Sequence, residues 1–200
     1  MNTLSATATK TTSSKTKQTN TPKQNISMMN DRQCVLAEVY RLTPDQAWVT
    51  DVAITGKGQT HIKDPLHADV EVAGVNILLG VHPAVGGDGD APVPGELLSA
   101  ALASCMDSTI RIIANRLSIE LTHLQVAASA EADVRGTLKL KHSIPVGFQK
   151  MHLSVDLETK AGTKSQMIKT LLSAAEASCV VLQTLKHPPE ITTQINVIDH

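Results

Sequence analysis

Residues 95–117 are too uniformly apolar to lie on a protein surface, and they limit the folds open to the whole chain. Read as a helix, this segment carries apolar side chains on nearly every side until Asn115 and Arg116. A helix without a polar face must be buried against other elements. Pro92 and Pro94 come just before it and break any preceding strand. We therefore predict one long central helix, enclosed by the rest of the chain.

Strand-like segments occur in groups on both sides of this helix. Those before it span residues 35–40, 48–54, 68–72 and 75–81, the last two joined by an Ala-Gly turn. Those after it span 121–134 and 146–157, and apolar and polar residues alternate from Met151 to Glu158, as in a half-buried strand. A second helix over 163–185 and a last strand over 191–198 follow. Grouped strands favour an α+β fold with antiparallel pairing.

The charge and aromatic content exclude several classes of partner. With 18 Lys and Arg against 19 Asp and Glu, the chain has no electrostatic basis for binding nucleic acid or an anionic membrane. Its only aromatic residues are Tyr40, Trp48 and Phe148, too few for stacking on single strands. It has no uninterrupted apolar stretch of roughly 18 to 20 residues and no secretory signal. Three cysteines, an odd number, suit a reducing compartment, so we expect a cytoplasmic protein whose disulfide, if any, is catalytic.

Residues 1–33 differ in composition from the rest. They are largely Thr, Ser, Lys, Gln and Asn, with almost no large apolar side chain. Such a segment buries too little apolar surface to offset the conformational entropy that it would lose on folding. We expect a disordered N-terminal tail over 1–33 and one domain over 34–200. A transit peptide is an alternative, although no arginine precedes Arg32. An upstream extension, with Met28 or Met29 as the natural start, is another.

Four short motifs follow one another in a recognisable order. They are Pro94–Cys105 on the predicted central helix, Asp133–Gly136, Pro145–Phe148, and Ala175–Leu185 on the second predicted helix. Together they resemble the OsmC/Ohr family over about residues 48–198. Each motif alone is weak, but four in the right order, with both cysteines in place, are specific.

The resemblance implies a fold and a chemistry. The fold is the OsmC-like one, an antiparallel sheet with two long central helices, in which two subunits form an intertwined homodimer with the reactive site at their interface. The chemistry is the reduction of organic hydroperoxides, with Cys105 as the peroxidatic residue and Cys179 as the resolving one. Reducing equivalents would come from a dithiol such as a lipoyl protein, without metal, flavin or other cofactor.

The chain departs from the usual family pattern at three places. Val180 follows the second cysteine where proline is usual. Gly95 stands where the hydroperoxide-resistance branch has a glutamate, so that Glu96 is shifted by one position. The activating arginine is missing too, because no arginine occurs between Arg41 and Cys105. These departures point to the less characterised OsmC-like branch.

Helical phase places the two cysteines on stripes that can face each other. Each stripe repeats at intervals of three and four residues: Leu98, Ala101 and Cys105 on one helix, and Leu172, Ala175 and Cys179 on the other. Peroxide reduction needs such a pair, since a thiolate attacks the O–O bond and a second thiol condenses with the resulting sulfenic acid. The alternative is that both are small core residues. Cys34 we interpret as a bystander.

No group near Cys105 in the sequence would make it a thiolate. Glu96 falls on the opposite helix face, so activation must come from another segment or from a partner subunit. The candidates are Arg41, Lys57, Lys63, His82 and Arg135. His82 precedes the glycine loop that leads into the Cys105 helix, and it either approaches the thiol or is merely solvated. Arg135 either pairs with Asp133 or contributes to the reactive site.

Glu176, three residues before Cys179, would raise the pKa of the Cys179 thiol, which suits a resolving cysteine.

Metal and phosphate sites are not predicted. Residues 86–90 lack the sequence of a phosphate loop and the spacing of a calcium loop, and His61, His67 and the cysteines lack the spacing of metal ligands.

Two candidate functions remain for the chain. One is a peroxidase for organic hydroperoxides, whose apolar tail suits an aliphatic pocket. The other is a non-catalytic module that binds a small apolar ligand or senses redox state. The retained cysteine pair favours the first, and the missing arginine favours the second.

Overall fold

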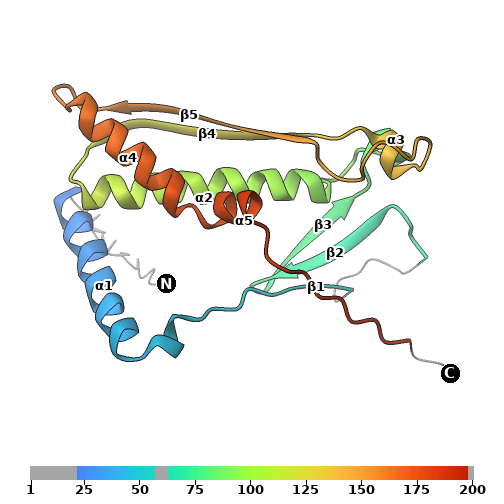
Figure 1. The fold of residues 1–200 in the computed structure, drawn as a ribbon, viewed down its shortest axis with the longest axis horizontal. Helices are drawn as coiled ribbons and strands as arrows, with labels where there is room; N and C mark the ends of the chain where they lie inside the picture. The colour runs from blue at the N-terminus through green and yellow to red at the C-terminus, as the bar shows by residue number, and fades with distance from the viewer. Residues whose placement is uncertain (1–21, 57–62, 198–200) are drawn as a thin grey trace, which may run out of the picture.

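The computed structural model describes residues 22–56 and 63–197, which form an α+β fold of helices and antiparallel strands (Figure 1). The helices are α1 Pro22–Leu42, α2 Pro94–Arg116, α3 Val134–Thr137, α4 Ser165–Ser178 and α5 Val180–Lys186, with short 3₁₀ turns at Pro44–Ala47 and Pro83–Val85. The strands are β1 Ala53–Thr55, β2 His67–Val72, β3 Val75–Gly80, β4 Leu121–Glu131 and β5 Lys150–Thr159. One sheet has the order β1-β2-β3, and β4 pairs with β5 in another. The predicted α+β class is confirmed.

Helix α2 lies at the centre of the fold, along the β4–β5 ribbon and beside α4 (Figure 1). Its buried side chains repeat every four residues, at Leu102, Met106, Ile110 and Ala114. The last three share a buried cluster with Ile119, Leu171, Ala175 and Cys179. The predicted central helix is therefore present, but it is buried along one stripe only. By length and hydropathy α2 also resembles a membrane span, which is common for the central helix of a packed fold.

The β4–β5 ribbon covers α2 with one of its faces. Its strands are antiparallel, with Leu124 opposite Leu157 and Glu131 opposite Lys150. Half-buried and exposed residues alternate along β5, as predicted. The inward side chains Leu153 and Leu157 pack against the buried cluster around α2. This packing holds the middle of α2 in place.

His67 ties the glycine-rich loop before α2 to strand β2. Its Nε2 lies 3.0 Å from Asp90 Oδ1, and its Nδ1 lies 3.0 Å from Asp64 Oδ2. The hydrogen bonds to Asp90 and Asp64 raise the pKa of His67, because both carboxylates favour the imidazolium. The N–H of Gly80 also donates to the carbonyl of Pro92 at 2.8 Å. The chain therefore enters α2 from an anchored loop.

The N-terminal part of the described chain differs from expectation. The strand predicted over 35–40 is wrong, because these residues belong to α1. The expected boundary between tail and domain, at residues 33 and 34, falls inside the same helix, while residues 1–21 lie outside the described part. Arg41 pairs with Glu38 one helical turn earlier, at 2.7 Å. Valine favours a strand only where neighbouring strands can pack against it. Residues 35–40 have no such strand beside them in the described part of the chain, and they are helical instead.

Three other elements are shorter or broken. The strand expected over 48–54 is reduced to β1. The strand expected over 191–198 has no regular structure up to residue 197, and Ile191 and Ile195 are each 84% exposed. A strand needs a hydrogen-bonded neighbour, and a single chain does not provide one at this place. The helix expected over 163–185 is interrupted at Cys179.

Candidate redox site

Cys179 lies at a sharp break between α4 and α5, which are bent by 64° relative to each other. Its φ of −73° and ψ of 107° are extended, so helical bonding stops there. Gln183 makes two hydrogen bonds that stabilise the break. Its main-chain N–H donates to the Cys179 carbonyl at 2.9 Å, and its side-chain amide donates to the Glu176 carbonyl at 2.8 Å. Val180 and Val181 begin a new helical turn, where main-chain N–H groups have no helical acceptor.

Cys105, on α2, faces this break. Its side chain is partly buried. Burial acts to raise the pKa of the Cys105 thiol, yet the pKa is lowered overall because hydrogen bonds outweigh burial. These bonds come from the N–H of Val181, the Cys179 thiol, the N–H of Val180 and the Thr109 hydroxyl. Donors of this kind favour the thiolate, which is the reactive form of cysteine.

Cys179 has the opposite character. Its side chain is fully buried, with 0% exposure. Burial raises the pKa of the Cys179 thiol, and the neighbouring Cys105 raises it further, although the N–H groups of Leu182 and Val181 act against this. The pair therefore consists of a partly accessible Cys105, whose pKa is lowered, and a buried Cys179, whose pKa is raised. The structure brings together the two cysteines that the helical stripes place face to face.

Three of the other predicted residues have structural partners. Glu96 accepts a hydrogen bond from the N–H of Val93 at 3.0 Å, at the start of α2. His82 accepts from the N–H of Ala84 at 3.0 Å. Glu176 accepts from Lys186 Nζ at 2.6 Å. The raised pKa of Cys179 comes from burial and from Cys105, while the Glu176 carboxylate pairs with Lys186.

The cationic candidates are also engaged elsewhere or lie outside the described part. Arg41 pairs with Glu38 on α1. Lys63 is exposed, and Lys57 belongs to residues that the structure does not describe. Arg135 pairs with Asp133, and its Nε donates to Asp133 Oδ1 at 2.9 Å. The hydrogen bond from Arg135 lowers the pKa of Asp133 to about 2.

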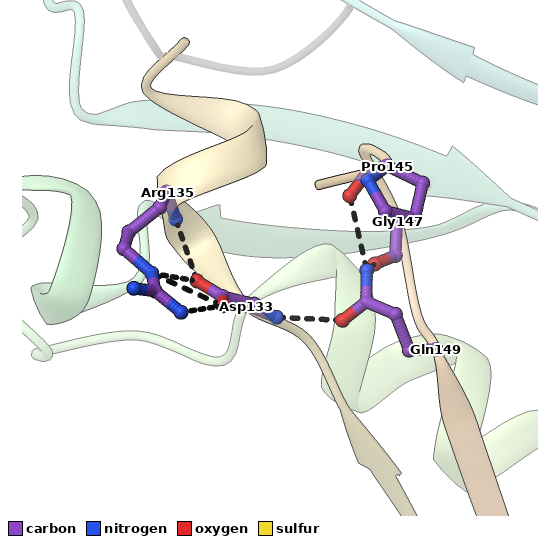
Figure 2. Close-up of polar contacts among 5 residues, drawn as sticks. All are labelled: Asp133, Arg135, Pro145, Gly147 and Gln149. Atoms are coloured by element: carbon purple, nitrogen blue, oxygen red, sulfur yellow. Dashed lines mark hydrogen bonds and ion pairs between the residues drawn. The ribbon is translucent and has the colours of Figure 1, made fainter. Parts of the chain in front are cut away.

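Gln149 joins this ion pair to the loop before β5, as Figure 2 shows. Its side-chain oxygen accepts the N–H of Asp133 at 2.7 Å. Its side-chain amide donates to the carbonyls of Gly147 and Pro145, at 2.6 and 3.0 Å. The side chain of Gln149 thus fixes the backbone just before Phe148 and ties it to Asp133. Arg135 therefore has a structural role in this corner of the molecule.

A groove of about 530 Å³ opens between α2, β5 and α5. Its apolar lining includes Leu98, Leu102, Phe148, Met151, Leu153 and Leu182. Phe148 packs directly on the backbone of α2, since a Cβ added at Gly95 would lie 2.7 Å from its ring. Leu102 lies three residues before Cys105, so the groove opens about one turn of α2 away from Cys105, which is not among the residues that line it. Such a groove suits a small apolar molecule.

Sequence reasoning missed the groups that act on the Cys105 sulfur. Main-chain N–H groups have no signature in a sequence, and Thr109 was not singled out. One signal was present: Val180 stands where the family usually has proline, which carries no N–H. In the described part of the chain, no three or more His, Cys, Asp or Glu side chains are grouped so as to hold a metal ion. The chemistry that this arrangement supports is thiol chemistry.

Several solved structures share the fold. An OsmC-like protein from Mycoplasma pneumoniae is 14% identical with a TM-score of 0.55, covering 70% of this chain and 89% of the other. An OsmC-like protein of unknown function from Vibrio cholerae is 15% identical with a TM-score of 0.53, covering 68% and 94%. An organic hydroperoxide resistance protein, OsmC, from Legionella pneumophila is 20% identical with a TM-score of 0.50, covering 70% and 92%. At these identities the likeness shows the fold alone.

A family model covers the part of the chain that carries the cysteine pair. Residues 87–194, more than half of the 200 residues, match the model described as OsmC-like protein. A comparison with curated proteins found no match. The family match includes Cys105, Cys179, the break between α4 and α5, and the groove. The chain belongs to the OsmC-like family.

Proposed function

We propose that this protein is a thiol peroxidase that reduces organic hydroperoxides. The observation that best supports this is the contact between Cys105 and Cys179, in which the pKa of one thiol is lowered and that of the other is raised. The first suits attack on a peroxide, and the second suits a thiol that waits for the oxidised product. The similar Legionella pneumophila protein is named for organic hydroperoxide resistance, which agrees with this chemistry.

The proposed cycle has three steps. The Cys105 thiolate attacks the outer oxygen of the hydroperoxide, the O–O bond breaks, and the alkoxide takes up a proton and leaves as the alcohol. Cys105 is then a sulfenic acid. The Cys179 sulfur attacks it, forming the disulfide and releasing water with the Cys179 proton. An external dithiol, such as a dihydrolipoyl group, reduces this disulfide and is itself oxidised to a disulfide.

The groove, about one turn of α2 from Cys105, supports an organic substrate over hydrogen peroxide. Its apolar lining would bury the carbon chain of a hydroperoxide, and each buried CH₂ group contributes about 0.8 kcal/mol. Hydrogen peroxide has no such group. We therefore expect binding to strengthen with the size of the apolar part until the groove is filled.

The assembly we propose is an intertwined homodimer in the cytoplasm. Trp48 and Ile191 are 85% and 84% exposed in the single chain, which is unfavourable for a protein that stays alone in water. The extended segment 191–197 would gain main-chain partners by pairing with a sheet edge of a second copy. Free thiols as reactants require a reducing compartment, which supports the cytoplasmic location.

Peroxide consumption in single-cysteine variants tests the proposal. Reduced protein is mixed with cumene hydroperoxide and a dihydrolipoyl donor, and the oxidised product is mapped by mass spectrometry. We expect Cys105→Ser to abolish consumption, and Cys179→Ser to allow one oxidation of Cys105 without turnover. Cys34→Ser is the matched control, because Cys34 is exposed and far along the chain from the pair. Unchanged consumption by Cys105→Ser would refute the peroxidase function.

The second candidate function is redox sensing or binding of a small apolar ligand. The apolar groove favours it, because such a groove serves a binding protein equally well. The same experiment separates the two. A sensor forms the Cys105–Cys179 disulfide once with one equivalent of peroxide, and a binding protein forms none, whereas a peroxidase turns over many times with the dithiol.

A further inference from the structure

The groove between α2, β5 and α5 has two ends of different character. Leu153 and Leu182 line it and also pack against the buried cluster around α2. Phe148 lines it too, but its ring lies against the backbone of α2 at Gly95. Gly95 comes ten residues before Cys105, which is about 15 Å along the helix axis. The Phe148 ring therefore closes the groove at the end farther from the cysteine pair.

Burial alone does not hold the Phe148 ring in this position. The side chain is 41% exposed. It belongs to the stretch 138–149, which is neither helix nor strand. Gly147, directly before it, has a φ of 99°, in the left-handed region that glycine adopts without strain. In such a stretch the position of the ring depends on what fixes the backbone next to it.

Gln149 fixes that backbone with both ends of its side-chain amide (Figure 2). The amide nitrogen donates to the carbonyl of Gly147 at 2.6 Å and to that of Pro145 at 3.0 Å. The amide oxygen accepts the N–H of Asp133 at 2.7 Å. Asp133 is itself held by Arg135, whose Nε lies 2.9 Å from Asp133 Oδ1. The residues before Phe148 are thus tied to a second, independently anchored segment.

We propose that Gln149 is a positioning residue for substrate selection: its hydrogen bonds hold the Phe148 ring as the end wall of the groove, and this wall limits the length of the apolar tail that a hydroperoxide can bury. Phe148 meets the tail directly, and Gln149 acts through it. The inference rests on the proposed function and narrows its substrates to hydroperoxides whose tail ends at this wall. Each CH₂ group buried in the groove strengthens binding about fourfold, whereas a CH₂ group beyond the wall stays in water and adds nothing.

Binding of straight-chain primary alcohols tests the end wall without any thiol chemistry. Such alcohols are the products of the proposed reaction when the substrate is a straight-chain alkyl hydroperoxide. Their dissociation constants are measured by titration calorimetry with the full-length reduced protein, over a series of increasing length. If a length limit is found but peroxide is not consumed, the proposed function fails and the end wall stands. The two failures are therefore distinguishable.

Phe148→Ala removes the wall, and Gln149→Leu removes the hydrogen bonds that hold it. Gln125→Leu is the matched control, because it makes the same change at an exposed position of β4, outside the groove. Phe148 and Gln149 are exposed too, so we expect all three variants to fold, and urea unfolding checks this.

In the wild type we expect the dissociation constant to fall about fourfold per CH₂ group up to a limiting length and then to stay constant. The first alcohol beyond this limit should bind about fourfold tighter than the limiting one in Phe148→Ala, and about twofold tighter in Gln149→Leu, where the ring is present but displaced. Gln125→Leu should keep the wild-type limit. Leucine at position 149 would also make the groove more apolar, but that raises affinity at every length alike and does not move the limit.

The position of the ring is measured separately by NMR. Phe148 is the only phenylalanine of the chain, so labelled phenylalanine gives one set of ring signals. We expect a nuclear Overhauser effect between this ring and the Hα atoms of Gly95 in the wild type and in Gln125→Leu, and its loss in Gln149→Leu. An effect that persists in Gln149→Leu, or a length limit that stays unchanged in Gln149→Leu or in Phe148→Ala, would overturn the inference.

Discussion

The chemistry of single residues in this site is set by hydrogen-bond donors. Cys105 would have a raised pKa from its burial alone, and its donors reverse that effect. Thr109 is the side-chain hydroxyl among them, and the Cys105 carbonyl, 2.7 Å from Thr109 Oγ1, competes with the sulfur for its single proton. It lies one turn after Cys105 on the same helix, so its position is fixed by α2 itself.

Replacing Thr109 with valine tests this donor with little change of shape. Donors stabilise the thiolate, so losing one raises the pKa of Cys105. We expect Thr109→Val to slow alkylation of the Cys105 thiolate by iodoacetamide about threefold below the wild-type pKa, and to have no effect at a pH above the pKa of both proteins. Thr109→Ser keeps the hydroxyl and serves as the control. A pH-independent loss of rate, or an equal loss in Thr109→Ser, would assign Thr109 a packing role instead.

At the scale of elements, two glycines allow close approaches around the groove. Gly95 lets the Phe148 ring lie against α2, and Gly136 lets α3 lie against the backbone of the loop before β5. The obstacles differ in kind. A Cβ at Gly95 would meet the end of a flexible side chain, whereas a Cβ at Gly136 would lie 2.6 Å from the carbonyl oxygen of Pro145.

The same substitution at the two glycines should therefore have different results. We expect Gly136→Ala to lower the free energy of unfolding by roughly 1 to 3 kcal/mol, because backbone must move. Gly95→Ala should change it by less than about 1 kcal/mol, because the ring can rotate away and alanine favours the helix.

Gly95→Ala should also displace Phe148, which lines the groove, and so lower the rate of reduction of cumene hydroperoxide relative to that of tert-butyl hydroperoxide. Urea unfolding and steady-state kinetics measure both effects. Equal destabilisation by the two variants would contradict this account.

At the scale of the whole molecule, the single chain leaves much apolar surface uncovered. The large hydrophobic side chains of the segment 191–197 are at least 79% exposed. This surface explains why a dimer is part of the proposed function.

Charges placed in the segment 191–197 test the dimer. Ile191→Asp with Ile195→Asp should convert a dimer into monomers, because two carboxylates would have to be buried without partners. Thr192→Asp with Gln194→Asp adds the same charge to the other face and should leave the dimer intact. Light scattering after size-exclusion chromatography gives the mass of each. A monomeric wild-type protein, or a dimer that survives the isoleucine substitutions, would refute the proposed assembly.

The central helix, the α+β class, the alternating strand β5 and the two cysteines that meet could all be predicted from the sequence. Each depends on the spacing at which apolar residues repeat, and that spacing can be read from the sequence directly. The helix over 22–42 could not be predicted, because the strand preference of residues such as Val35 and Val39 takes effect only where neighbouring strands exist.

Only the tertiary structure decided which groups surround the Cys105 sulfur and where the apolar groove lies. The donors at Cys105 are largely main-chain groups, and every residue except proline carries the same N–H. Their direction depends on the backbone angles of Cys179, which no local pattern specifies. The groove likewise exists only because α2, β5 and α5 meet in the folded chain. The sequence alone determined that this chain would carry a cysteine pair on two helices, and the packing of those helices determined that the pKa of Cys105 is lowered and that of Cys179 is raised.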